Sequence, residues 1–85
     1  MTTYKVKQTE NGITFKRGRR LECRIIRYRG GYSAEYCFTW TGGCFSYYYK
    51  KAEFRRMMGT VLNYLGNVVY AGPVEFVGMK NIKPF

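Results

Sequence analysis

The chain has 85 residues, of which 15 are Lys or Arg and five are acidic; it contains no His, and its formal net charge is +10. A chain of this length holds one hydrophobic core, so we expect a single domain over residues 1–85. Its hydrophobic fraction of 46% and aromatic fraction of 19% exclude an intrinsically disordered protein. So much like charge on a small body attracts polyanions, and the expected partner is a nucleic acid or an acidic surface of a protein or ribonucleoprotein.

Membrane, metal and catalytic roles find no support in the sequence. The start MTTYKVKQTE lacks an apolar leader, and no apolar run approaches the roughly 18 residues of a membrane span, so we expect a cytoplasmic protein without membrane contact. Cys23, Cys37 and Cys44 form no C-x-x-C pair, and we expect three free thiols in a reducing compartment. Without His, and with only scattered Glu residues, the chain lacks the usual groups of a zinc site or an acid-base pair. We therefore expect no enzyme, no metal and no cofactor.

Three turn dipeptides divide the first part of the chain into strands. Asn11-Gly12, Gly30-Gly31 and Gly42-Gly43 supply the positive φ angles that two-residue hairpin loops need. The strands expected between them cover residues 4–8, 13–16, 21–28, 32–41 and 44–49. If each glycine pair forms a whole loop, Cys23 lies opposite Phe38 and Phe38 lies opposite Tyr47. This register predicts an antiparallel meander in which Cys37 and Cys44 lie too far apart along the strands to form a disulfide.

Alternation along these strands sorts the side chains onto an apolar face and a polar, basic face. The polar face is expected to include Glu22 together with cations, hydroxyl residues and tyrosines. The apolar face is expected to hold Tyr4, Val6, Ile13, Phe15, Leu21, Cys23, Ile25, Ala34, Tyr36, Phe38, Trp40, Phe45, Tyr47 and Tyr49.

Residues 50–66 have the period of an amphipathic helix. Their apolar positions follow a stripe made of Phe54, Met57, Met58, Val61, Leu62 and Leu65. Gly66 is expected to end the helix in a left-handed cap, and Gly59 to mark a close approach to the sheet or a local weakening. Residues 68–70 and 74–77 resemble short strands. The predicted fold is α+β: an antiparallel β-meander of four to five strands, one helix packed on one face, and a short C-terminal strand or strands.

The polar sheet face is the first candidate for a binding site. Cations there can meet phosphates and flat Tyr rings can stack on bases, a combination that is typical of single-strand binders. Basic residues in the run KRGRR and at the start of the helix extend the candidate site. The candidate binding residues are Lys5, Lys7, Lys16, Arg17, Arg19, Arg20, Arg24, Tyr28, Tyr48, Lys50, Lys51 and Arg55.

A structural explanation exists for each part of this candidate site. The sheet face and the basic run can serve as a solvated surface, with Tyr present for its strand propensity. Glu35 is placed diagonally to Arg24 and can neutralise it. Cations in the first turns of a helix oppose its dipole and favour an anion there, although an ordinary exposed helix face explains them too.

Two functional classes are consistent with this composition and pattern. The first is a non-catalytic nucleic-acid-binding module, with single strands favoured. The second is an inhibitor of the kind carried by phages and mobile elements, such as the anti-CRISPR proteins, which this chain resembles in size and composition. The order of several strands followed by a helix is also similar, in topology alone, to small coactivators that bind single-stranded DNA. The sequence leaves the oligomeric state open, with a homodimer among the options.

Overall fold

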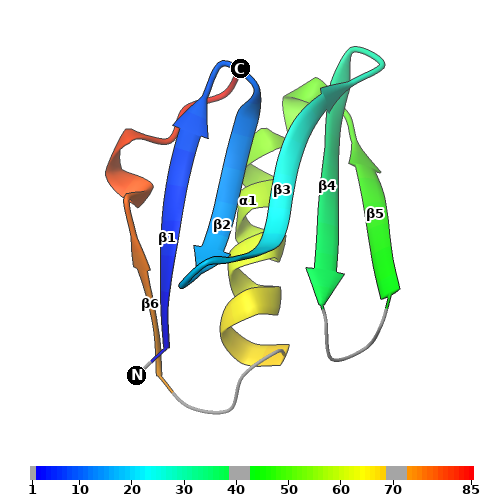
Figure 1. The fold of residues 1–85 in the computed structure, drawn as a ribbon. Coiled ribbons are helices and arrows are strands. Elements are labelled where there is room, and N and C mark those ends of the chain that lie inside the picture. Colours follow the sequence, from blue (N-terminus) through cyan, green and yellow to red (C-terminus); the bar gives the residue numbers. More distant parts are fainter. Residues whose placement is uncertain (1, 39–42, 69–72) are drawn as a thin grey trace.

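The computed structural model describes residues 2–38, 43–68 and 73–85 (Figure 1). The strands in these parts of the chain are β1 (Thr2–Thr9), β2 (Gly12–Arg17), β3 (Arg20–Tyr28), β4 (Gly31–Phe38), β5 (Gly43–Tyr49) and β6 (Val74–Val77). The helical elements are η1 (Lys51–Glu53), α1 (Phe54–Asn63), the π-helical turn η2 (Tyr64–Val68) and η3 (Met79–Asn81). The strands form one sheet in the order β5-β4-β3-β2-β1-β6. β1 to β5 form the predicted antiparallel meander, and β6 pairs with β1 in the parallel direction.

Helix α1 covers one face of the sheet, behind β2 and β3 in the view of Figure 1. The helical period predicts this arrangement correctly, because the stripe faces the sheet. The buried residues of α1 and η2 are Phe54, Met57, Met58, Val61 and Leu65. They pack against the buried strand residues Tyr4, Val6, Ile13, Phe15, Cys23, Ile25, Tyr32, Ala34 and Tyr36. None of the described elements covers the other face, which we call the open face. Among the described residues, no helix is long and apolar enough to cross a membrane.

The β3–β4 turn uses one glycine fewer than the sequence pattern predicts. Its loop residues are Arg29 and Gly30, with φ angles of 48° and 77°, and Tyr28 pairs with Gly31. Cys23 therefore lies opposite Tyr36 instead of Phe38. The register moves by two residues, an even number, so this shift by itself moves no side chain of β3 or β4 to the other face.

The β4–β5 pairing differs more and overturns the expectation of three free thiols. Phe38 pairs with Gly43, so the connection spans residues 39–42. These residues, which include Trp40, lie outside the described part of the chain. This register places Cys37 directly opposite Cys44, with a Cα–Cα distance of 4.4 Å, and the two form a disulfide. Cys23 is free and buried, and burial raises the pKa of its thiol.

A β-bulge between β2 and β3 exchanges the predicted faces of Leu21 and Glu22. The register shifts between Phe15 and Lys16, so the alternation along β3 is broken before Cys23. Glu22 turns inward and is 4% exposed, whereas Leu21 turns out to the open face and is 38% exposed.

The sequence also assigns residues of β5 to the covered apolar face that the structure leaves exposed. Phe45 and Tyr47 point to the side of the sheet that carries α1, but they are 36% and 55% exposed. Figure 1 shows that β5 lies beyond the edge of α1. α1 runs roughly along the strands, and a helix with its side chains is about 10–12 Å across, which is narrower than six strands spaced about 4.8 Å apart. The outermost strand therefore keeps its aromatic residues exposed.

The two helical glycines have roles other than those predicted. Gly66 lies inside the π-helical turn and does not adopt a left-handed conformation. Gly59 is exposed, and a Cβ at this position would meet no atom within 4 Å, so it does not mark a close approach to the sheet. Of the predicted strands after the helix, 74–77 is confirmed as β6. For 68–70, Val68 belongs to the π-helical turn and the rest lies outside the described residues.

Candidate functional site

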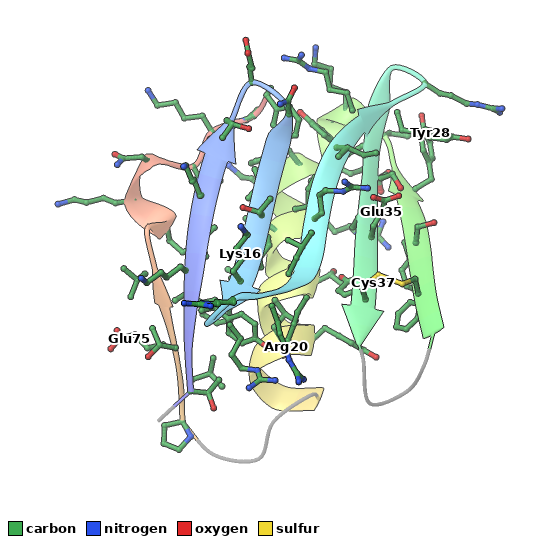
Figure 2. The ribbon with its side chains drawn as sticks, in the orientation of Figure 1. Lys16, Arg20, Tyr28, Glu35, Cys37 and Glu75 are labelled. Atoms are coloured by element: carbon green, nitrogen blue, oxygen red, sulfur yellow. A yellow bond between two sulfur atoms is a disulfide. The ribbon has the colours of Figure 1, made fainter. Side chains whose placement is uncertain are left out.

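The open face combines cations, hydroxyl groups and the side chains of Tyr28 and Tyr48. Figure 2 labels Lys16, Tyr28 and Glu35 on it. Because directly opposite residues share a face, the strand register assigns its members. They are Thr3, Lys5, Lys7, Thr9, Thr14, Lys16, Leu21, Arg24, Ile26, Tyr28, Ser33, Glu35, Cys37, Cys44, Ser46, Tyr48, Glu75 and Val77. Alternation in the sequence predicts most of this face correctly, since only the bulge changes its membership.

An ion pair occupies the middle of the open face. The Nε and Nη2 atoms of Arg24 both donate to Oε1 of Glu35, over 2.9 and 2.6 Å. The two residues lie directly opposite each other on β3 and β4, one step closer than the diagonal placement expected. Arg24 is therefore partly neutralised, as its predicted proximity to Glu35 implies, and contributes less to binding an anion than an unpaired cation would.

Three lysines on β1 and β2 form the unpaired basic part of the open face. Lys5 lies directly opposite Lys16, and Lys7 lies opposite Thr14, two residues further along β1. All three lysines are exposed, and none forms an ion pair with any residue that the structure describes. Like charges directly opposite each other on a sheet are destabilising, so a bound anion would relieve their repulsion.

The basic run at the β2–β3 turn divides into a structural part and an exposed part. Nε of Arg17 donates to Oε1 of the buried Glu22 over 2.9 Å, so Arg17 serves the fold. Arg19 and Arg20 are exposed at the turn and at the start of β3. Figure 2 places Arg20 near the end of the sheet where β2 meets β3, away from Tyr28.

Tyr28 and Tyr48 form the aromatic part of the open face. Their rings meet edge to face with centroids 6.1 Å apart, and their exposed fractions are 44% and 52%. The Tyr48 hydroxyl donates to the backbone oxygen of Arg29 over 3.4 Å, which ties β5 to the β3–β4 turn. Exposed rings held in fixed positions can stack on bases without a large entropy cost.

A pocket of about 200 Å³ lies beside Tyr28, at the rim where the open face ends. Its lining residues are Arg27, Tyr28, Arg29, Gly30, Gly31, Lys51 and Phe85. The Arg29 guanidinium lies 5.3 Å from the centre of the Tyr28 ring, and that of Arg27 lies 5.4 Å from the centre of the Phe85 ring. Arg27 and Arg29 are absent from the predicted site, although their position on either side of Tyr28 in the sequence RYRGG is a usable signal.

The start of the helical region supplies its own anion. The backbone N–H of Lys50 donates to Oε1 of Glu53 over 2.9 Å, and Nη1 of Arg56 donates to Oε2 over 2.7 Å. These contacts, the first above all, lower the pKa of Glu53. The fold therefore needs no external anion to balance the cations at this position.

Arg55 lies apart from the open face. It lines a groove of about 440 Å³ between α1 and the C-terminal segment, together with apolar residues that include Met58, Leu62 and Ile82. The structure thus does not bring Arg55 together with the other predicted site residues, whereas Lys51 joins them through the pocket at the rim.

No family model, curated protein or solved structure matches the chain. Within the described residues, no group of three or more His, Cys, Asp or Glu side chains is placed to hold a metal ion.

Proposed function

We propose that the protein is a non-catalytic module that binds single-stranded nucleic acid on the open face. The observation that carries the proposal is an exposed, edge-to-face pair of tyrosines on the same uncovered sheet face as three lysines that form no ion pair within the described parts of the chain. Lysines on such a face attract the phosphates, and the rings offer π surfaces to the bases. Unstacked bases are available in single strands, which favours them over duplexes.

The geometry suggests a path for a bound nucleic-acid strand across the open face. The lysines lie on β1 and β2, the tyrosines lie on β3 and β5, and the Arg24–Glu35 pair lies between them. A nucleic-acid strand that crosses the sheet in this direction would first place its phosphates near the lysines and then its bases near the tyrosines. The central ion pair offers hydrogen-bonding groups with little net charge.

A second candidate function is binding to an acidic protein, as an inhibitor of phage or mobile-element type would do. It is favoured by the presence of Glu35 and Glu75 among the cations of the open face, because mixed charges are common in protein interfaces. The exposed Leu21 on the same face would add apolar contact area.

Both functions are compatible with the expected cytoplasmic location, where free thiols are the rule. There the Cys37–Cys44 disulfide would be exposed to reduction, since both cysteines are exposed. The proposed binding residues do not depend on this bond, because the hydrogen-bonded pairing of β4 with β5 extends on to Tyr49.

Neighbouring tyrosines on β5 give a matched test. Tyr48 points to the open face and Tyr47 to the other side, with similar exposed fractions of 52% and 55%. We expect Tyr48→Leu to weaken binding to a fluorescent single-stranded oligonucleotide by roughly five- to 150-fold, the value of one stacked base, and Tyr47→Leu to leave it unchanged. Fluorescence anisotropy at physiological salt measures both.

Two results would contradict the proposal. One is an equal loss of affinity in the two variants, which would show that the oligonucleotide does not bind specifically on the open face. The other is wild-type affinity no tighter than the non-specific range of about 10⁻⁴ to 10⁻⁶ M, which would favour the acidic-protein partner instead.

A further inference from the structure

The pocket at the rim of the sheet is surrounded by positive charge. Arg27 and Arg29 come from β3 and its turn, and Lys51 comes from η1. None of the three forms an ion pair with any residue in the described parts of the chain, and no acidic residue lines the pocket. Three positive charges therefore border one hollow of about 200 Å³.

The guanidinium group of each pocket arginine lies over an aromatic ring, a contact that favours one arrangement of the side chain. Arg29 has a φ angle of 48°, the only positive value of a non-glycine residue in the described chain, and its guanidinium lies over the Tyr28 ring. Arg27 lies over the Phe85 ring, and the backbone oxygen of Phe85 accepts a hydrogen bond of 2.9 Å from the Tyr32 hydroxyl. Charged groups with one favoured arrangement lose less conformational entropy when an anion binds than freely rotating ones do.

The size and charge of the pocket fit one phosphate group better than a larger ligand. Pockets for drug-sized molecules measure about 300–1,000 Å³, so 200 Å³ suits a phosphate with part of its sugar. A phosphate monoester carries about −1.5 to −2 charges at pH 7 and presents three acceptor oxygens. A phosphodiester inside a strand carries a single charge. Three cations around one hollow therefore match the monoester more closely.

We infer that this pocket receives the terminal phosphate of a strand bound on the open face, so that the protein recognises phosphorylated strand ends. Tyr28 connects the two parts, because it lines the pocket and belongs to the open face. The terminal base would stack on the tyrosine pair while its phosphate enters between Arg27, Arg29 and Lys51. This inference rests on the proposed function and adds the part of the nucleic acid that is recognised.

The test compares three oligonucleotides of one sequence, with a 5′-phosphate, a 3′-phosphate or hydroxyl groups at both ends. We expect the wild-type protein to bind one phosphorylated form at least tenfold more tightly than the hydroxyl form. The double variant Arg27→Gln/Arg29→Gln should lose this preference. The charge-matched control is Lys80→Gln/Lys83→Gln, which removes two exposed cations outside the pocket lining and the open face and should keep the preference.

The outcomes separate the inference from the proposed function. Equal affinity of the wild-type protein for all three oligonucleotides would overturn the inference and leave binding on the open face intact. A preference that persists in the folded double variant would also overturn it, since the pocket would not be its source. If no oligonucleotide binds, the proposed function fails and recognition of strand ends fails with it. The wild-type comparison decides the question even if the double variant does not fold.

Discussion

At the scale of single residues, the buried carboxylate of Glu22 links three strands. It accepts hydrogen bonds from the Tyr4 hydroxyl of β1, over 2.5 Å, and from Nε of Arg17 of β2, over 2.9 Å. A buried ion pair adds little net stability by itself, but removing one partner leaves an uncompensated charge. Arg17 therefore matters to the fold more than to binding, a distinction that the basic run KRGRR does not reveal in the sequence.

We expect Arg17→Gln to lower the free energy of unfolding by about 2 kcal/mol or more, less than the 3–5 kcal/mol of a fully buried pair because the Arg17 side chain is 34% exposed. Arg19→Gln, which removes the same charge from an exposed turn position, should change it by less than about 0.5 kcal/mol. Urea denaturation followed by circular dichroism measures both. Similar stabilities of the two variants would show that Arg17 does not compensate Glu22.

The exchange of Leu21 and Glu22 marks the limit of prediction at this scale. Strict alternation predicts the faces of nearly all strand residues, because one side of the sheet must be apolar. It fails where a bulge inserts one residue, and a bulge depends on contacts across strands that the local sequence does not contain. The burial of Glu22 depends in turn on Tyr4 and Arg17, both distant in sequence or on another strand.

At the scale of elements, turn chemistry predicts where hairpins occur but not their register. Glycine pairs mark the β3–β4 and β4–β5 turns correctly, yet Arg29 itself adopts a positive φ in the first, and the second has a longer connection. Both registers shift by an even number of residues, so these shifts keep the side chains on their predicted faces but change their cross-strand partners. The disulfide is the largest consequence, since it depends entirely on the partner of Cys37.

The disulfide should stabilise the β4–β5 hairpin and the whole fold. Its cysteines are separated by 7 residues in sequence, and closing a loop of that size in the unfolded chain is worth about 2–3 kcal/mol by chain entropy. We expect dithiothreitol to lower the unfolding free energy of the wild-type protein by this amount, and to have no effect on Cys37→Ser/Cys44→Ser. Alkylation of the oxidised protein under denaturing conditions should modify Cys23 alone. Three modified thiols in protein purified without reductant would contradict the assignment.

At the scale of the whole molecule, the net charge of +10 is distributed unevenly. Three Glu residues pair with Arg17, Arg24 and Arg56, so these cations contribute little to the external field. The unpaired cations include the lysines of β1 and β2 and the residues of the rim pocket. Composition alone predicts a polyanionic partner, but it cannot tell paired cations from unpaired ones, because pairing depends on the folded geometry.

The candidate site is therefore predicted in part. The sequence places the lysines, Tyr28 and Tyr48 on one face, since their positions follow from alternation alone. It misses Arg27, because alternation assigns this residue to the apolar side of the sheet. Arg27 lines the rim pocket because it lies next to the last residue of β3. It also includes Arg55, whose helical position directs it to a groove on the other side of the molecule.

The distribution of charge makes a quantitative prediction about salt. For single strands, the slope of log K against log salt is about −0.7 for each neutralised phosphate, so Lys5→Gln/Lys7→Gln/Lys16→Gln should flatten the slope by about 2. The control Arg24→Gln/Glu35→Gln removes a cation and its partner from the same face without changing the net charge, and it should leave the slope unchanged. Removing the Lys5–Lys16 repulsion should not destabilise the fold, so lost affinity in the triple variant would reflect lost phosphate contacts. Equal slopes in the wild-type protein and the triple variant would mean that the strand does not lie over β1 and β2.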